Sequence, residues 1–184
     1  ALEELGVPYE KVKLDLAAGD QKKPDYLALN PNGKVPLLVV DGTPVFESLA
    51  MIIHLGESHG VEKGLYPAPG PARAEALKWI AWSSVTLGDA LSRVLRNSSE
   101  RFPEDQRNAA AGAAAKAEII DLLGIVDRTL EGKDFLLGKD FTLADLSIAT
   151  FLPFFMRLGI DYGVGNAFGP ALAQPEFDFN RPLW

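Results

Sequence analysis

The sequence predicts an α/β domain followed by an all-helical domain. Three observations support this fold class. Short apolar runs separated by turn residues, typical of strands, occupy the N-terminal third of the chain. A segment rich in proline and glycine, Gly64 to Pro71, then interrupts the pattern. Beyond it, apolar residues recur at helical spacing. We therefore expect one domain at 1–62, a linker at 63–71 and a second domain at 72–184.

The first elements of the N-terminal domain alternate between helix and strand. Ala1 to Leu5 resemble the last turns of a helix, for which Gly6 is a good C′ residue. Tyr9 to Leu16 alternates tolerably between apolar and polar residues and is predicted to be a strand. After a polar loop, Pro24 to Leu29 can form a single helical turn.

The most informative stretch runs from Asn30 to Ser48. Pro31 and Gly33 predict a turn, after which the dipeptide 35–36 (Val-Pro) opens an apolar run from Leu37 to Val40. Because proline has no N–H group to donate to a sheet, the edge that precedes it is free to bind something else.

A β-hairpin and a helix complete this stretch. The dipeptide 41–42 (Asp-Gly) predicts the hairpin turn, and 45–46 (Val-Phe) the returning strand. The dipeptide 47–48 (Glu-Ser) then begins a helix that we expect to extend to about His59. A serine hydroxyl and free N–H groups at the positive end of a helix dipole can bind a carboxylate. With Lys34 nearby, the stretch suits a small, extended, acidic peptide.

The C-terminal domain is predicted to contain long helices. Ala72 to Arg96 has one broad apolar face, and Glu104 to Leu130 is rich in alanine. A third helix has a body from Leu146 to Phe155 that is apolar nearly all round and should be buried. From Gly159 to Trp184 we expect mostly irregular structure, with a short turn near 170–173.

The third helix has a recognisable start. Thr142 and Asp145 have the spacing of a capping box, with Asp in the usual Glu or Gln position. Phe141 and Leu146 stand at the two positions of a hydrophobic staple. We interpret this motif as structural and not catalytic.

Composition excludes several classes of function. The chain has 184 residues, 47% hydrophobic and 23% charged, as in ordinary globular proteins. A net charge of −7 without a basic stripe argues against nucleic-acid binding. The chain contains no cysteine, which excludes a thiolate metal site or a cysteine nucleophile within it. His54 and His59 lack further ligand partners, so we expect no bound metal.

No apolar run approaches the length of a membrane span, and no signal or transit peptide is visible. We therefore expect a cytoplasmic protein that does not associate with membranes.

The motifs, taken together, resemble those of the cytosolic glutathione transferases. The most specific are NPNGKVP at Asn30 to Pro36, FES at Phe46 to Ser48 and FTLADLS at Phe141 to Ser147. Their order and separations extend the resemblance over nearly the whole chain, in a bacterial, theta/phi-like style. The resemblance implies a thioredoxin-like N-terminal domain, an all-helical C-terminal domain, glutathione S-transferase activity and a homodimer.

The resemblance also assigns a binding site for glutathione as co-substrate. Pro36 would be a cis-proline that exposes the main chain of Val35, whose N–H and C=O would pair with the cysteinyl unit. Glu47 would lie near the γ-glutamyl ammonium and Ser48 at the carboxylate. The positively charged residues near the glycyl end would be Lys34 and Lys22. The alternatives are an ordinary strand-start proline and solvated loop lysines.

A pocket for a small hydrophobic electrophile would lie between the domains. Trp82, Ser83 and Thr86 are spaced to share one face of the first long helix there. The alternative is that Trp79 and Trp82 are core residues, as tryptophans at helical spacing usually are.

Transferases of this family use a hydroxyl or thiol group to stabilise the glutathione thiolate and lower its pKa from about 8.5 toward neutrality. That group lies at the end of the first strand or the start of the first helix, which we expect to precede Ala1. The thioredoxin-like domain would then be incomplete, without its first strand, and the catalytic residue is unknown. The C-terminal segment does not supply the family's usual final helix either, so we expect a fragment of a longer protein.

Two alternative functions stay open. A glutathione-dependent disulfide reductase or peroxidase could use the same fold. A non-catalytic binding module is the alternative outside enzymes, and it fits a chain without an activating residue.

Overall fold

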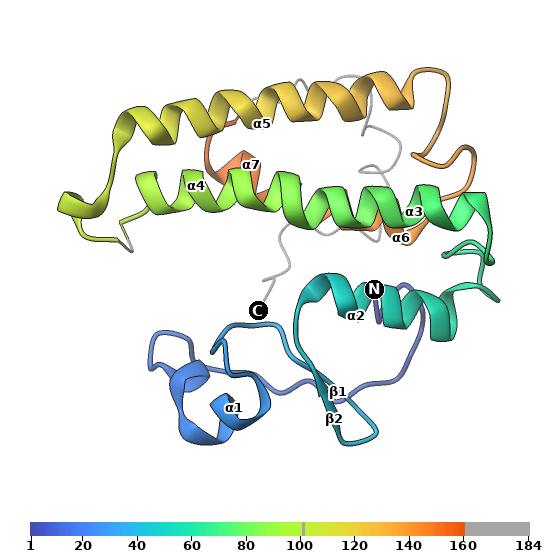
Figure 1. The fold of residues 1–184 in the computed structure, drawn as a ribbon, viewed down its shortest axis with the longest axis horizontal. Helices are drawn as coiled ribbons and strands as arrows, with labels where there is room; N and C mark the ends of the chain where they lie inside the picture. The colour runs from blue at the N-terminus through green and yellow to red at the C-terminus, as the bar shows by residue number, and fades with distance from the viewer. Residues whose placement is uncertain (101, 161–184) are drawn as a thin grey trace. The chain divides into compact units, whose positions relative to one another are not determined.

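The computed structural model describes residues 1–100 and 102–160 of the chain. The chain divides into two compact units, of which the first comprises Ala1–Tyr66 and the second begins at Pro67 (Figure 1). In the described residues, the first unit contains a β-hairpin and short helices, and the second contains helices with connecting loops.

The N-terminal residues form a helical turn that ends at Gly6. The Leu5 amide donates to the Ala1 carbonyl at 2.9 Å, as in an α-helix. Gly6 has φ 56°, and the amides of Gly6 and Val7 donate to the carbonyls of Glu3 and Leu2, respectively. This pair of bonds is a Schellman motif, so the predicted role of Gly6 as the C′ residue is confirmed.

The predicted strand from Tyr9 to Leu16 is wrong for this structure. The segment has no regular secondary structure, and no described residue pairs with its backbone as a neighbouring strand would. An alternating pattern is compatible with a strand, but a strand also requires a hydrogen-bonded neighbour. Helix α1, Pro24–Leu29, follows as predicted.

The hairpin is present. Strands β1, Leu38–Val40, and β2, Thr43–Val45, pair antiparallel with Leu38 opposite Val45. Asp41 and Gly42 have φ 48° and φ 81°, as the two-residue turns of tight hairpins require. The returning strand ends at Val45, one residue earlier than we predicted.

Helix α2, Ser48–Leu55, begins where predicted but changes geometry before its end. Gly56–Gly60 forms a π-helical turn, so the α-helix does not extend to His59. A Cβ atom on Gly60 would lie 2.7 Å from the Cβ atom of the fully buried Tyr66. Glycine is therefore required for the chain to fold back over the end of this helix.

The first long helix of the second unit is interrupted. Helix α3, Pro71–Trp82, continues through a π-helical segment, Ser83–Leu87, into helix α4, Gly88–Ser98. The predicted helix from Ala72 to Arg96 is thus present in extent but not uniform in geometry. The apolar periodicity continues through the π-helical segment and does not reveal it.

Helix α5, Ala109–Leu130, packs against α4 (Figure 1). It begins five residues later than predicted, because Glu104–Gln106 forms a separate 3₁₀ turn. The side chain of Asn108 caps the helix by accepting a hydrogen bond from the Ala111 amide at 3.0 Å.

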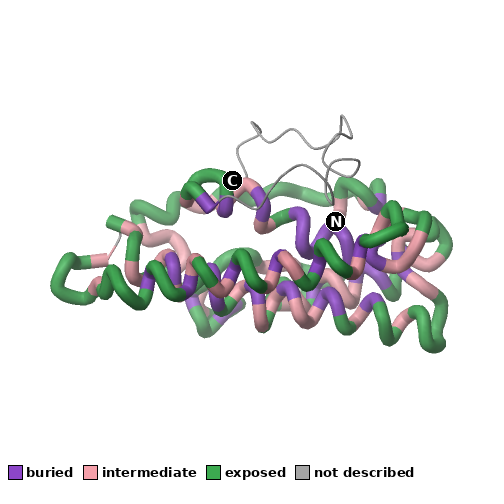
Figure 2. Tube along the Cα trace, turned by 90° about the horizontal axis from the view of Figure 1, so that it is seen from above, coloured by how far each residue is buried: buried purple, intermediate pink, exposed green. Residues whose placement is uncertain are grey.

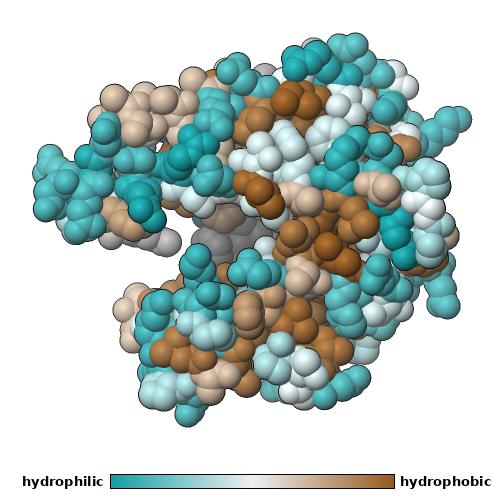
Figure 3. All heavy atoms as spheres, in the orientation of Figure 1, coloured by the Kyte–Doolittle hydropathy of each residue, from teal (hydrophilic) through white to brown (hydrophobic). Residues whose placement is uncertain are grey.

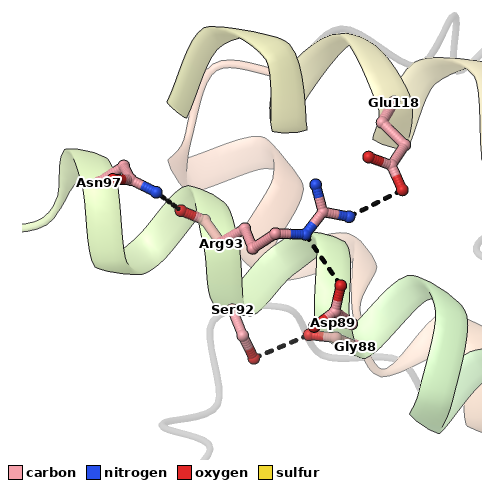
Figure 4. Close-up of polar contacts among 6 residues, drawn as sticks. All are labelled: Gly88, Asp89, Ser92, Arg93, Asn97 and Glu118. Carbon is pink, nitrogen blue, oxygen red and sulfur yellow. Dashed lines mark hydrogen bonds and ion pairs between the residues drawn. The ribbon is translucent and has the colours of Figure 1, made fainter. Parts of the chain in front are cut away.

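An ion-pair network joins α4 to α5 (Figure 4). The Arg93 guanidinium donates to Asp89 Oδ2 at 2.8 Å within α4 and to Glu118 Oε1 at 2.7 Å on α5. The hydrogen bond from Arg93 holds the pKa of Glu118 below its usual value.

The predicted third helix consists of two helices, α6, Leu143–Ala149, and α7, Leu152–Arg157. Pro153 explains the break, since it has no N–H group for the carbonyl four residues earlier. The predicted capping box is confirmed: the Thr142 side chain accepts from the backbone, and Asp145 Oδ2 accepts from the Thr142 amide at 2.9 Å. Asp145 Oδ1 also accepts from the Leu136 amide at 2.7 Å. Burial raises the pKa of Asp145, although these hydrogen bonds oppose the shift.

The core of the second unit is made by facing stripes of the helices (Figure 2). All seven residues of α6 are buried, and α6 packs against α3. The other fully buried side chains there include Ala76, Ile80, Leu87, Val94, Ile119, Val126, Leu152 and Phe155.

Both units leave some apolar side chains exposed to solvent (Figure 3). Among the described residues, the most exposed large ones are Val12, Val85 and Met156. The irregular structure predicted for the C-terminal segment, including the turn near 170–173, lies outside the described residues.

Candidate functional site

The hairpin register brings the two halves of the predicted binding motif to the same end of the sheet. Leu38 pairs with Val45, Val35 precedes Leu38 by three positions, and Ser48 follows Val45 by three. The antiparallel pairing therefore brings Val35 and Ser48 to the same end of the hairpin. The candidate site therefore lies at the open end of the hairpin, within the first unit.

The main chain of Val35 is available to a ligand. The peptide bond between Val35 and Pro36 is cis, as the resemblance implied. Val35 is 45% exposed, and within the described residues neither its N–H nor its C=O makes a hydrogen bond. It lies outside β1, so its backbone groups are not used by the hairpin. A peptide backbone could therefore pair with Val35 as an added strand does.

The start of α2 supplies further donors. The first helical bond runs from the Met51 amide to the Glu47 carbonyl at 3.1 Å, so the amides of Ser48, Leu49 and Ala50 precede the hydrogen-bonded ladder. The hydroxyl of Ser48 is exposed beside them. This group of donors at the positive end of a helix suits a carboxylate.

Glu47 occupies a conformation that is rare for a residue with a side chain. Its φ is 70° and its ψ is 109°, at the N-cap position of α2, and its side chain makes no capping hydrogen bond. Such a conformation costs on the order of 1–3 kcal/mol and is concentrated at functional sites. The exposed carboxylate of Glu47 could interact with a ligand ammonium group.

The two predicted lysines differ in their surroundings. Lys22 is the last residue of the 3₁₀ turn Asp20–Lys22, which precedes α1, and its Nζ donates to the Asn32 carbonyl at 3.4 Å. Lys34 is exposed, and no described residue pairs with its ammonium group. Both residues belong to the first unit, where Lys34 immediately precedes Val35. The free charge of Lys34 can therefore attract a second carboxylate of a peptide ligand.

Two residues that the sequence interpretation missed hold this loop in place. Tyr26 Oη donates to the Lys34 carbonyl at 2.7 Å, and so does Asn30 Nδ2, also at 2.7 Å. Asn30 is only 2% exposed. The Asn-Pro sequence at 30–31 is a known turn signal and could have indicated Asn30, whereas no local signal marks Tyr26.

The three residues predicted for the electrophile pocket lie at or beside the π-helical segment of the second unit. Trp82 is half-buried at the end of α3 and contacts Trp79 edge to face, with ring centroids 5.5 Å apart. Thr86 is also half-buried. Ser83 is buried, and its hydroxyl donates to the Ile80 carbonyl at 2.9 Å. The backbone of the helix thus already uses the Ser83 hydroxyl.

Metal binding and membrane insertion find no support in the part of the chain that the structure describes. No cluster of three or more histidine, aspartate or glutamate side chains is placed there to hold a metal ion. None of the helices at 1–100 and 102–160 is long and apolar enough to cross a membrane.

Comparison with known proteins gives the family. The profile described as "Glutathione S-transferase, N-terminal domain" matches residues 1–58, and the one described as "Glutathione S-transferase, C-terminal domain" matches residues 109–174. Glutathione S-transferase GstB of Escherichia coli strain K12 is 34% identical over 163 residues, which are 88% of this chain and 77% of the relative.

Solved structures agree. The theta class glutathione S-transferase of Xanthomonas axonopodis pv. citri, solved with glutathione bound, is 30% identical with a TM-score of 0.73, covering 84% of this chain and 73% of that chain. The glutathione transferase URE2P6 of Phanerochaete chrysosporium, solved with oxidized glutathione, is 26% identical with a TM-score of 0.82, covering 95% of this chain and 83% of that one. The predicted fold class, a thioredoxin-like N-terminal domain followed by an all-helical domain, is confirmed. Sequence, hairpin and comparisons agree that the chain belongs to the cytosolic glutathione S-transferase family.

Proposed function

We propose that this chain binds glutathione at the open end of the hairpin and belongs to an enzyme that transfers the glutathione thiolate to small apolar electrophiles. One observation carries the proposal. The unpaired main chain of Val35 and the start of α2 both adjoin the open end of the hairpin, and the Ser48 hydroxyl and the first amides of α2 are free. Two solved relatives whose structures contain glutathione or oxidized glutathione support the choice of ligand.

Each part of glutathione has a counterpart in the site. The cysteinyl N–H and C=O would pair with the Val35 backbone as an added strand. The γ-glutamyl carboxylate would accept hydrogen bonds from Ser48, and the γ-glutamyl ammonium would lie near Glu47. The glycyl carboxylate would face Lys34, with Lys22 as a second cation on that side. The site thus offers groups of complementary charge to the zwitterionic γ-glutamyl end and to the anionic glycyl end of glutathione.

The proposed reaction forms a bond between the thiolate sulfur and an electrophilic carbon, from which a leaving group such as halide departs with the bonding electrons. In this proposal Trp82 and Thr86 contact the electrophile. Ser83 shapes the pocket chiefly by the hydrogen bond from its hydroxyl to the backbone of the helix. The residue that activates the thiol is not assigned. The protein would work as a cytoplasmic homodimer.

Replacing the serine tests the ligand site. We expect Ser48→Ala to weaken glutathione binding by on the order of 1.5–3 kcal/mol, because a hydrogen bond to a charged carboxylate is lost. Isothermal titration calorimetry with reduced glutathione measures the change.

Ser58→Ala is a matched control, since Ser58 is exposed in the π-helical turn that follows α2. It should bind glutathione like the wild type. Equal affinity of wild type and a Glu47→Ala, Ser48→Ala double variant would refute the site assignment.

A glutathione-dependent disulfide reductase is a second candidate. Its support is that URE2P6 and the glutathione transferase of Pseudomonas putida were solved with oxidized glutathione or glutathione disulfide. Parallel assays with an aryl halide and a small disulfide separate the two reactions. Glutathione binding without turnover of either compound, and without absorbance from the thiolate, would instead indicate a non-catalytic binding module.

A further inference from the structure

The carbonyl of Lys34 accepts two hydrogen bonds, although it belongs to an exposed loop. The donors are Tyr26 Oη and Asn30 Nδ2, each at 2.7 Å. Tyr26 lies within α1, and Asn30 is the residue that ends it. A single carbonyl in an exposed loop can be satisfied by water, so two protein donors on it exceed what solvation requires.

This carbonyl belongs to the same peptide unit as the Val35 amide. The bond between Lys34 and Val35 is trans, so the C=O and N–H of the unit are coplanar and point in opposite directions. Holding the carbonyl toward α1 therefore directs the Val35 N–H away from α1. That N–H makes no hydrogen bond to any residue in the described part of the chain.

We propose that Tyr26 and Asn30 are positioning residues that orient the Lys34–Val35 peptide for the ligand backbone, an inference that rests on the proposed glutathione function. Neither side chain touches glutathione. They act by keeping the Val35 N–H in its binding direction before the ligand arrives, so the loop loses less conformational freedom on binding.

Asn30 also fixes the other end of the loop. Its Oδ1 accepts from the Asn32 amide at 3.1 Å, and its own carbonyl accepts from the Gly33 amide at 2.9 Å. One buried side chain thus bridges the start and the end of the turn. Rotation of the Lys34–Val35 peptide would break both hydrogen bonds to its carbonyl.

The loop is also closely packed at Gly33, against Gln21 and Leu27. A Cβ atom on Gly33 would lie 2.9 Å from the Gln21 carbonyl and 3.0 Å from Leu27 Cδ2. The turn is therefore in close contact with Gln21 and with Leu27 of α1 at Gly33. Lys34 and Val35, the next two residues, are exposed.

Tyr26→Phe is the sharpest test, because it removes one hydroxyl and keeps the ring. We expect glutathione affinity to fall by about 2- to 10-fold, as for the loss of one neutral hydrogen bond, with the melting temperature nearly unchanged. Asn30→Asp removes the second donor and keeps the Oδ1 acceptor. The losses from the two variants should be non-additive, since both donors serve one carbonyl.

Tyr9→Phe is the matched control, since the Tyr9 hydroxyl donates to Glu3 Oε1 at 2.7 Å and not to the Lys34 carbonyl. It should bind glutathione like the wild type. The amide resonance of Val35 in a heteronuclear correlation spectrum, recorded without ligand, should shift in Tyr26→Phe and stay in place in Tyr9→Phe.

The two readouts separate this proposal from the proposed function. If the wild-type chain does not bind glutathione, the proposed function fails, and the Val35 resonance alone decides whether the two donors orient the peptide. If the wild type binds, unchanged affinity in Tyr26→Phe overturns the positioning role, whatever the resonance does. An unmoved Val35 resonance overturns it as well.

Discussion

Glu47 and Gly33 hold the backbone of the candidate site in conformations with positive φ, at 70° and 56°. The two positions differ in what they require. Gly33 is buried against neighbouring atoms, whereas Glu47 keeps an exposed side chain in a strained conformation. A glycine at position 47 would adopt this conformation with less strain, yet the chain has a glutamate there. The strained conformation of Glu47 therefore fits a side chain that contacts a ligand.

Gly33→Ala should destabilise the native state by about 2–4 kcal/mol, because it combines a positive-φ penalty with overpacking. The added Cβ would meet Lys22 Nζ at 2.7 Å and the Gln21 carbonyl at 2.9 Å. Urea denaturation measures the loss.

Gly42→Ala provides the control for the crowding. Gly42 has φ 81°, and a Cβ there would have no atom within 4 Å. Gly42→Ala should destabilise the native state by the cost of the left-handed conformation alone, roughly 1–2 kcal/mol. Equal losses in the two variants would show that the packing under the loop contributes nothing.

At the scale of secondary-structure elements, side chains that reach a second element decide how helices pair. Asp145 caps its own helix and also accepts from the Leu136 amide in the preceding loop. Arg93 donates to Asp89 within α4 and to Glu118 on α5. Each side chain thus links a local feature of one helix to the placement of another segment.

Arg93→Gln should lower the melting temperature at neutral pH, and the difference from wild type should narrow in acid. Because Arg93 lowers the pKa of Glu118, its contribution is fully present above the ordinary Glu pKa and is lost as the pH falls through the lowered value. Thermal melts over a pH series measure this difference.

Arg96→Gln is the matched control on the same helix, since Arg96 is exposed and has no ion-pair partner among the described residues. A difference for Arg93→Gln that stayed constant with pH would contradict the role of the Glu118 pair. High salt should also reduce the effect, because the network is partly exposed.

At the scale of the whole molecule, ligand binding should raise the free energy of unfolding of the chain. If glutathione binds only the native state, a concentration one hundred times its Kd should stabilise the chain by about 2.7 kcal/mol. For Ser48→Ala, whose binding we expect to be on the order of 1.5–3 kcal/mol weaker, the same concentration should stabilise the chain by only about 0.3–1.3 kcal/mol. Denaturant melts with and without glutathione measure both values, and no stabilisation of the wild type would contradict the proposed binding.

Much of the local structure could be predicted because it depends on neighbouring residues. Gly6 ends a helical turn, and the turn at Asp41 and Gly42 closes a hairpin, since both need backbone conformations that few residues adopt. Thr142 and Asp145 form their capping box within one turn of helix. Pro153 could also have been recognised as a helix break, although the apolar pattern around it concealed the signal.

Other features depend on partners that lie elsewhere in the chain. The segment from Tyr9 to Leu16 has the pattern of a strand, but pairing requires a neighbour that a local pattern cannot supply. The π-helical segments are equally invisible to periodicity, since Ser83–Leu87 continues the apolar face of its helix.

By itself, the sequence determined the family, the fold class and the order of the binding motifs, because these follow from residue types at fixed spacings. Only the tertiary structure revealed that Tyr26 and Asn30 donate to the same carbonyl, that of Lys34, and that the adjacent Val35 amide makes no hydrogen bond within the described residues. The physical reason is that a hydrogen bond depends on the positions and directions of two groups in space. Those positions are settled by how α1 packs against the loop, and not by either residue alone.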